Sequence, residues 1–409
     1  MTTGYKQTEI GVIPEDWDVK PLGKIGEALI GLTYKPAEVR DHGTLVLRSS
    51  NIQNDALSFD DNVFVDADIP ERIMVRPGDV LICVRNGSRD LIGKSALLDE
   101  RAKGMTFGAF MAVYRSPIGT LASYLFQSAV LKRQINEHLG ATINQITNKS
   151  LNSFRIPVPP SVPEQRAIAE ALSDADALIE SLEQFIAKKR HIKQGAMQEL
   201  LAGKKRLPGF GGEWEVVKAG DIGRFRGGSG FPTKFQGASS GAYPFFKVSD
   251  MNNEGNETFM EAANNYISEA LRKQLGATAF PAKSIVFAKV GAAVFLERKK
   301  ILAKASCLDN NMAAFVLDSG RADCRYIHYV LLNKKMSDLV STTALPSLSG
   351  SVLAAIELML PPLPEQTAIA AILSDMDAEI AALETKLAKA RQIKQGMMQE
   401  LLTGGIRLV

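Results

Sequence analysis

The sequence predicts an α+β protein with a pseudo-twofold internal repeat, in which two mixed α/β domains are joined by two long helices that pair within the chain. Three observations predict this fold. Residues 163–203 align with residues 364–404 without a gap, and 27 of 41 positions are identical. Both copies carry one apolar heptad pattern. Each is preceded by roughly 150 residues in which short β-rich runs alternate with Gly, Pro, Asn and Asp.

The repeat also predicts where each part begins and ends. "PEDWDVKPLGKIG" at residues 14–26 resembles "GGEWEVVKAGDIG" at residues 211–223, whereas the similarity between these anchors and the helices is thin. Alike segments indicate a shared structural role, and variable regions indicate two different recognition roles. We therefore expect a first domain at 1–157, a first long helix at 158–206, a second domain at 207–359 and a second long helix at 360–409.

The two similar segments, residues 163–203 and 364–404, are predicted to be paired helices. Their apolar residues recur in steps of 4, 3, 4, 3 and 4, which is the seam of a coiled coil. In the first copy these are Ile168, Leu172, Ala175, Ile179, Leu182 and Ile186, and in the second Ile369, Leu373, Met376, Ile380, Leu383 and Leu387. So short a seam indicates that the copies pair with each other, and about 39 helical residues would span about 58 Å.

The distal turns of both helices are candidate docking surfaces for a partner. A glycine interrupts each helix at a cost of about 1 kcal/mol, so its presence in both copies indicates close approach of another backbone. Methionine and leucine beside it form a soft surface that suits either a partner or internal packing, and the sequence leaves both open. The candidate docking residues are Gly195, Met197, Leu200, Gly396, Met398 and Leu401.

Polar loops in the two variable regions are candidate nucleic-acid contacts. Their positions repeat while their chemistry differs: "GLTYKP" corresponds to "GGSGFPTK", "RSSNIQN" to "KVSDMNN", "VRNGSR" to "AKVG" and "TINQITNK" to "ALPSLSGS". Arg, Lys, Asn and Gln can read base edges, and Ser, Thr and backbone N–H groups bind phosphates. Ordinary solvated turns are the alternative. The candidate readers are Arg48, Asn51, Arg85, Asn86, Lys149, Lys234, Lys247, Asp250, Asn252 and Lys289.

Composition and motifs exclude several classes of protein. The net charge of +3 allows a polyanionic partner without requiring one. The cysteines Cys83, Cys307 and Cys324 lack metal or disulfide spacing and predict reduced thiols in a cytoplasmic protein. The chain has no secretory signal and no run of about 18 apolar residues, so no membrane association is expected.

Catalytic motifs are also missing. "GSRDLIGKS" at residues 87–95 imitates a phosphate loop, but five residues rather than four separate its glycines. The four histidines lack ligand spacing, so no metal site is expected. Asp174 and Asp176, like Asp375 and Asp377, are two positions apart on a helix and point in different directions. We therefore predict no catalytic residue in this chain.

The repeated segments resemble the DNA-specificity subunits of Type I restriction–modification systems. The likeness is carried by "IPVPPSVPEQRAIAEALSDADALIESLE", "IKQGAMQELLAGKKRLPGF", their second copies and the "IPEDW"-type start of each half. It covers essentially the whole chain and is weak inside the variable domains. One departure is the extra residue in "PPSVPEQ" against "PPLPEQ", which shifts the entry turn of the first helix.

The resemblance implies that the helices form an intramolecular antiparallel coiled coil and that two target-recognition domains each read half of a bipartite, asymmetric site in double-stranded DNA. It also implies two methyltransferase (modification) subunits that bind S-adenosylmethionine, and restriction (translocase/nuclease) subunits that complete the endonuclease; no cofactor is expected in this chain. Helix length would then set the gap between half-sites. Two alternatives stay open: a fused methyltransferase–nuclease, which would need a cofactor fold, and a coiled-coil scaffold that does not bind DNA.

Overall fold

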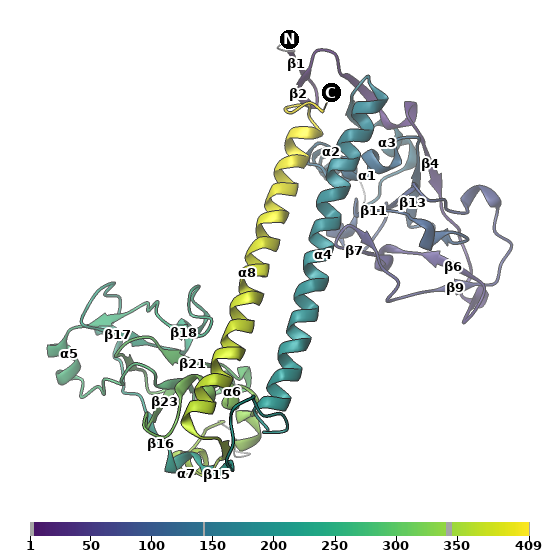
Figure 1. Ribbon diagram of the computed structural model, residues 1–409. Coiled ribbons are helices and arrows are strands. Elements are labelled where there is room, and N and C mark those ends of the chain that lie inside the picture. Colours follow the sequence, from purple (N-terminus) through teal and green to yellow (C-terminus); the bar gives the residue numbers. More distant parts are fainter. Residues whose placement is uncertain (1–3, 142–143, 341–345, 409) are drawn as a thin grey trace. The chain divides into compact units, whose positions relative to one another are not determined.

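The computed structural model describes residues 4–141, 144–340 and 346–408, so parts of two predicted loops, residues 142–143 and 344–345, lie outside the described residues. The chain forms two compact units (Figure 1). Unit 1 comprises Met1–Gln184 and Thr385–Val409, and unit 2 comprises Phe185–Glu384. Each unit therefore contains one variable domain together with a part of both long helices.

The domain in unit 1 is built on two small sheets. The first has the order β11 (Ser95–Leu97), β10 (Val80–Cys83), β13 (Met111–Arg115) and β4 (Glu27–Ile30), with all neighbours antiparallel. The second has the order β12 (Thr106–Phe107), β6 (Thr44–Leu47), β9 (Phe64–Val65) and β5 (Val39–Arg40). β10 reads Val-Leu-Ile-Cys and is buried throughout, as expected for a strand covered on both faces.

The remaining elements of unit 1 frame these sheets. Helices α1 (Gly119–Gln127), α2 (Ala129–Ala141) and α3 (Asn148–Ser153) follow β13. Three strand pairs complete the unit. They are β1 (Tyr5–Thr8) with β2 (Gly11–Pro14), β7 (Ile52–Gln53) with β8 (Ala56–Leu57), and β3 (Asp18–Pro21) with β14 (Arg155–Val158).

The domain in unit 2 repeats this plan. Its main sheet has the order β16 (Gly223–Gly227), β23 (Met312–Leu317), β20 (Ile285–Ala288), β21 (Lys299–Leu302) and β18 (Phe259–Met260). The smaller sheet has the order β19 (Tyr266–Ile267), β17 (Tyr243–Phe246) and β22 (Cys307–Leu308). Helices α5 (Glu269–Gln274), α6 (Cys324–Leu332) and α7 (Gly350–Ala354) accompany them, and β15 (Glu215–Lys218) pairs with β24 (Glu357–Leu360).

The two long helices are α4 (Val162–Leu200) and α8 (Leu363–Leu401), each of 39 residues, as the heptad pattern predicts. The expected starts at 158 and 360 are too early, because β14 and β24 run to those residues. Within each unit the helices pair antiparallel. Glu183 meets Arg391 at 2.5 Å in unit 1, and Glu384 meets Arg190 at 2.5 Å in unit 2.

The ends of the helices are part of the domain cores. In unit 1, Leu401 and Leu402 at the end of α8 pack with Ile168 and Leu172 near the start of α4. In unit 2, Leu200 at the end of α4 and the following Leu201 pack in the same way with Ile369 and Leu373 of α8. Burying one such side chain contributes about 2 kcal/mol. Each helix therefore begins in one core and ends by completing the other.

None of the helices in the described part of the chain is both long and apolar enough to cross a lipid bilayer.

Candidate nucleic-acid interface

Three of the predicted loops in unit 1 meet at the short segment between β12 and β13. The backbone of Phe107 accepts a hydrogen bond from Leu32, and Gly108 donates to Leu47, directly before the loop at Arg48. The carbonyl of Phe110 accepts from both Val84 and Arg85, at 3.1 Å each. Loops that lie far apart in the sequence therefore share one backbone platform, residues 107–110.

Unit 2 contains the same platform at residues 308–311. Ser229 donates to Leu308, Asp309 donates to Phe246 and Lys289 donates to the carbonyl of Asn311 at 2.8 Å. Close packing fixes a glycine in each unit. A Cβ at Gly31 would overlap the carbonyl oxygen of Gly108, and a Cβ at Gly228 would overlap that of Asp309.

Several predicted readers in unit 1 lie on this loop cluster. Arg85 is exposed, and its guanidinium lies 5.1 Å from the centre of the Phe110 ring. Asn86 donates to the Ser49 hydroxyl at 3.3 Å, so the loops of Arg85 and Arg48 are joined directly. Arg48 is partly engaged by Asp61 at 2.8 Å.

Lys149 is exposed on α3, next to Asn148, whose side chain donates to the carbonyl of Ala28 at 2.8 Å. The predicted loop that precedes it also reaches the cluster, because Ile146 donates to the carbonyl of Val84. Lys149 therefore lies on a short helix that is fixed to β4 and follows a loop bonded to Val84.

The predicted readers of unit 2 differ in their exposure and in their contacts within the chain. Lys234 is exposed and its ammonium lies 4.9 Å from the centre of the Phe235 ring. Lys247 is half-buried and donates to Gln236 at 3.0 Å. Lys289 is half-buried beside Gly227, and Asn252 is exposed. The exposed Lys234 and Asn252 are thus presented outward, whereas Lys247 also holds its own loop together.

Two predicted readers are interior residues and have a different role. Asn51 is fully buried, and its amide donates to Ser58, Asp61 and Asn62. Asp250 is fully buried and accepts from the Lys247 backbone and from Asn264, and burial raises the pKa of its carboxyl. Asn and Asp commonly bond to nearby backbone in turns, and these two side chains shape the loops rather than face solvent.

Sequence reasoning missed the side chains at the centre of each cluster. Phe110 is 59% exposed although it is a large aromatic residue. The corresponding Asn311 is exposed on the second platform. Phe110 does not stand in a polar run, and the short run Asp309–Asn311 was not proposed as a reader; the backbone pairing brings both positions next to the three loops.

The phosphate-loop imitation is structurally unlike a nucleotide site. Residues Arg89–Leu91 form a single 3-10 turn, and β11 follows at Ser95 where a phosphate loop would open a helix. The Lys94 ammonium donates to the carbonyl of Ile52 at 3.1 Å and ties two loops together. Among the described residues there is no group of three or more His, Cys, Asp or Glu side chains placed to hold a metal ion.

The predicted docking residues divide into two groups. Leu200 and Leu401 are core residues, and Met197 and Met398 pack against the same cores, so internal packing accounts for these four. Within the described chain no backbone approaches Gly195 or Gly396, so the predicted approach of another backbone there stays a prediction about a partner. A Cβ at either glycine would meet nothing within 4 Å among the described residues.

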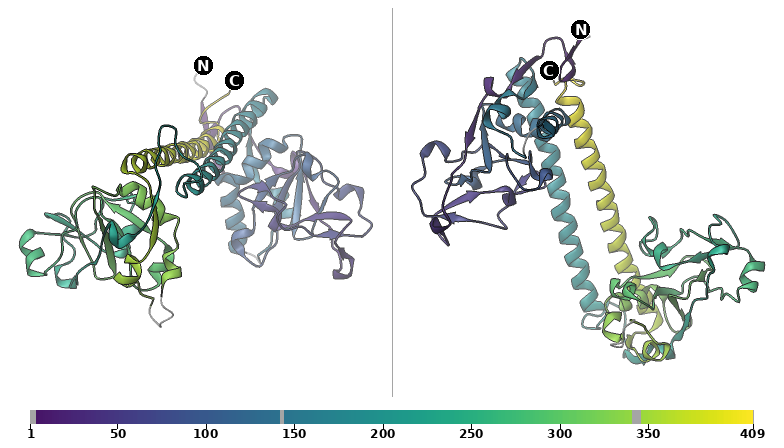
Figure 2. Two further views of the ribbon diagram at one scale, coloured as in Figure 1. Left: turned by 60° about the horizontal axis from the view of Figure 1, so that its bottom comes forward. Right: turned by 180° about the vertical axis from the view of Figure 1, so that it is seen from behind.

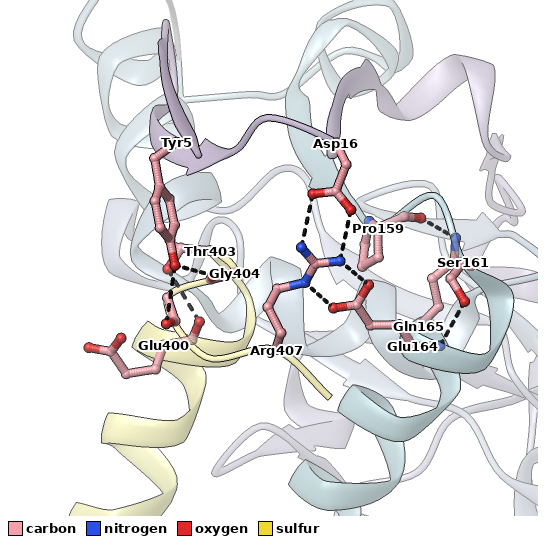
Figure 3. Close-up of polar contacts among 11 residues, drawn as sticks. Tyr5, Asp16, Pro159, Ser161, Glu164, Gln165, Glu400, Thr403, Gly404 and Arg407 are labelled. Carbon is pink, nitrogen blue, oxygen red and sulfur yellow. Dashed lines mark hydrogen bonds and ion pairs between the residues drawn. The ribbon is translucent and has the colours of Figure 1, made fainter. Parts of the chain in front are cut away.

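An arginine clamp fixes the first turn of each long helix. In unit 1, Arg407 binds Glu164 through Nη2 at 2.9 Å and Asp16 through Nη1 at 2.9 Å (Figure 3). In unit 2, Arg206 binds Glu365 at 2.7 Å, and Trp214 donates to the same carboxylate at 3.1 Å. Each clamp therefore joins the segment after one helix to the start of the other.

A further contact in unit 1 joins β1 to the segment that follows α8. The Tyr5 hydroxyl donates to the carbonyl of Gly404 at 3.3 Å, and β1 and β2 lie next to the C-terminal residues in all three views (Figures 1 and 2). In unit 2 one uninterrupted segment, from Arg206 to Trp214, supplies the clamp: the Arg206 guanidinium lies over the Trp214 ring, and Trp214 donates to Glu365.

A second repeated contact attaches each domain to both helices. In unit 1 the Tyr124 hydroxyl of α1 donates to Asp176 of α4 at 2.8 Å, and Lys394 of α8 pairs with the same carboxylate. In unit 2 Tyr329 donates to Asp377 at 2.7 Å, and Lys193 is the basic partner. Asp176 and Asp377 thus each attach a domain to the long helices.

The fold and these loops define a class of protein. The same domain plan and the same long helix occur twice in the chain, whereas the exposed loops of the two domains differ in chemistry. This combination is typical of a recognition subunit with two different targets.

Comparison with known proteins identifies the family. A family model for the Type I restriction modification DNA specificity domain matches residues 14–189 and 211–392. The chain therefore belongs to the DNA-specificity family of Type I restriction–modification systems, whose role is to supply DNA sequence specificity.

Individual relatives agree with this assignment. The putative type I restriction enzyme MjaX specificity subunit of Methanocaldococcus jannaschii is 26% identical, over 99% of this chain and 97% of its own length. The EcoKI specificity subunit of Escherichia coli is 31% identical, but the match covers 42% of this chain and 38% of that protein. The crystal structure of a Type I S subunit from M. genitalium matches with a TM-score of 0.59 and 14% identity, over 98% and 99% of the two chains, and supports the fold.

Proposed function

We propose that the two loop clusters read the two halves of a bipartite, asymmetric target in double-stranded DNA, and that this chain is the non-catalytic member of a cytoplasmic complex. The observation that carries the proposal is the platform itself. The same backbone bonding recurs at residues 107–110 and 308–311, yet the side chains around it differ. One geometry with two chemistries suits two different half-sites.

The exposed and partly exposed side chains divide into two roles in this proposal. Arg85 and Asn86 in unit 1, with Asn252 and Lys289 in unit 2, are assigned to base edges, because Arg and Lys suit guanine and Asn suits adenine. Lys149 and Lys234 are assigned to phosphates. Arg48 and Lys247 contribute charge while holding their loops, and the buried Asn51 and Asp250 are left out of the interface.

Methylation mapping tests the reading of two half-sites. The chain is produced with its modification subunit, and the methylated motif is determined for the wild type, Arg85→Ala and Lys149→Ala. Arg85→Ala should relax one position of one half-site at a cost of about 1–3 kcal/mol and leave the other half-site unchanged. Lys149→Ala should weaken binding to all sequences and reduce its salt dependence. A chain whose complex shows no salt-dependent duplex binding is instead a scaffold that does not bind DNA.

We further infer that two modification subunits, which would carry the S-adenosylmethionine site, dock on one repeated stripe of the long helices, and that restriction subunits complete the assembly. The stripe is defined by exposed or half-exposed residues that are identical in the two copies and follow steps of 4, 3 and 4 on one helical face. It consists of Lys188, Ile192, Gly195 and Glu199 on α4, and of Lys389, Ile393, Gly396 and Glu400 on α8.

Exposure and identity together support this stripe. Ile192 and Ile393 are 47% and 52% exposed, so packing within the described chain does not explain why both are isoleucine. Open space around Gly195 and Gly396 leaves room for a helix of another subunit to approach closely. Identical partners would require the same surface twice.

Single and double variants test the docking stripe by stoichiometry. Ile192→Glu should remove one modification subunit from the purified complex, and Ile192→Glu with Ile393→Glu should remove both. Leu178→Glu is the matched control, because Leu178 is 48% exposed on the same helix and the repeat carries Glu379 there. Unchanged stoichiometry, measured by light scattering, would place the docking surface elsewhere.

A further inference from the structure

Each platform ends in an exposed side chain that the sequence analysis did not propose as a reader. Phe110 directly precedes β13, and Asn311 directly precedes β23. The two positions are equivalent, because Cys83 pairs with Met111 in unit 1 and Ala288 pairs with Met312 in unit 2. Both carbonyls also accept a backbone hydrogen bond from the loop that follows the central strand.

The platform displays these side chains rigidly. In unit 1, Ala109 donates to the carbonyl of Leu32 and Met111 donates to that of Gly108, so the residues on both sides of Phe110 are fixed. In unit 2, Met312 donates to the carbonyl of Asp309, and Asn311 donates through its backbone to the Asp309 carboxylate at 3.1 Å. A backbone held in this way loses little conformational entropy on binding.

The exposure of the side chain at this position does not depend on stacking with Arg85. Arg85 lies over the Phe110 ring, but the residue equivalent to Arg85 in unit 2 is Val290. The equivalence follows from the isolated bridges, which join Arg85 to Gln145 and Val290 to Ser347. Asn311 is therefore exposed although Val290 replaces the arginine.

The chemistry of the two side chains differs in a way that DNA can use. In the major groove, an apolar side chain packs on the 5-methyl group of thymine, and an asparagine amide pairs with N6 and N7 of adenine. The buried Asp309 carboxylate accepts a hydrogen bond from the Asn311 backbone and so helps to hold the residue in place.

We propose that positions 110 and 311 are specificity-determining: Phe110 contacts the methyl group of a thymine in one half-site, and Asn311 makes a two-point contact with an adenine in the other. This inference rests on the proposed reading of DNA by the loop clusters. It adds one base-contacting position per half-site at the centre of each cluster, where the three loops meet.

Motif mapping with four variants tests the proposal. The variants are Phe110→Ala and Asn311→Ala, with Val12→Ala and Asn333→Ala as controls, because Val12 is exposed on β2 and Asn333 is exposed after α6, both away from the platforms. Phe110→Ala should relax one T·A position of one half-site. Asn311→Ala should lower discrimination at one A·T position of the other by roughly 5- to 150-fold. Neither control should alter the motif.

A chemical probe isolates the methyl contact. Replacing the assigned thymine by deoxyuridine removes only the methyl group and should weaken binding of the wild-type complex about fourfold. The same replacement should have no effect on the Phe110→Ala complex.

The outcomes separate this proposal from the broader one. If the wild-type motif maps and Arg85→Ala changes it, but neither Phe110→Ala nor Asn311→Ala does, the central positions are not readers and the proposed function stands. If Phe110→Ala changes only a guanine position, the ring is a support for Arg85, and this inference is wrong. If the complex shows no sequence-specific methylation or binding at all, the proposed function fails instead.

Discussion

Arg407 is the residue on which the first turn of α4 depends. Glu164 has a side chain only 1% exposed, and Arg407 supplies its counter-charge. Hydrogen bonds to Glu164 and Asp16 raise the pKa of Arg407, and the hydrogen bond from Arg407 lowers the pKa of Asp16. Glu164 lies in the first turn of α4, where an acid favours the helix dipole, and it is also half of a buried ion pair.

Replacing Arg407 by methionine should destabilise unit 1 by about 3–5 kcal/mol, because Glu164 would remain as an uncompensated buried charge. Urea unfolding can follow unit 1 alone in a Trp214→Phe background, where Trp17 is the remaining tryptophan. Asp16→Asn is the control and should cost less than about 1 kcal/mol, since that side chain is 42% exposed. An unchanged urea midpoint in Arg407→Met would show that the clamp is not a stabilising contact.

His328 gives unit 2 a pH dependence of known sign. It is buried, and its Nε2–H donates to the carbonyl of Lys299 at 2.8 Å. Burial lowers the pKa of His328 below 6.5. Below pH 6.5 the unfolded chain therefore binds a proton that the folded chain resists, and stability falls as the pH falls.

In a Trp17→Phe background, Trp214 is the remaining tryptophan and follows unit 2 alone. With His328 intact, unit 2 should lose stability between pH 6.5 and 5.5, and this one group should contribute up to about 1.4 kcal/mol per pH unit. His328→Gln keeps a donor for Lys299 and cannot titrate, so its curve should be flatter over that range. Parallel curves for the two proteins would mean that His328 is not the group responsible.

At the scale of elements, the Tyr–Asp–Lys contact couples a domain to two helices at once. Burial raises the pKa of the Tyr124 hydroxyl, which stays protonated and donates to Asp176. The heptad seam alone does not provide this attachment, because Asp176 lies beside the seam residue Ala175 rather than in it. Domain orientation on the helix therefore depends on polar contacts as well as on the apolar stripe.

Tyr124→Phe should destabilise unit 1 by about 1.5 kcal/mol, the contribution of a hydrogen bond to a charged group. Hydrogen exchange should rise in α1 and in the part of α4 around Asp176. Tyr329→Phe is the matched variant in unit 2 and should produce the same change around Asp377 only. If either variant raised hydrogen exchange equally in both units, the contact would not be a local anchor.

For the whole molecule, the length of the helices is the variable to change. Both α4 and α8 pass from one unit into the other, and both end by completing a core. Removing one heptad from each, about 10 Å of helix, should change the preferred gap between half-sites and leave both half-sites intact. Methylated motifs with unaltered spacing would show that the helices do not set the gap. A deletion in one helix only is the control and should disrupt pairing.

The sequence by itself determined the duplication, the long helices and several β-rich runs of each domain, because these depend on periodicity and repetition that are local along the chain. It also located the loops that the structure brings together. The exposure of Arg85, Lys149 and Lys234 could be predicted from the sequence, because basic residues in polar turns rarely have an interior alternative.

Only the tertiary structure decided which side chains of those loops face solvent. Asn51 and Asp250 have the composition of readers but bond to their own loops, and Phe110 has the composition of a core residue but is exposed. Leu200 and Leu401 belong to cores that lie far away in the sequence. The physical reason is that burial is set by which distant segments pack together, and those contacts leave no trace in the local pattern of residues.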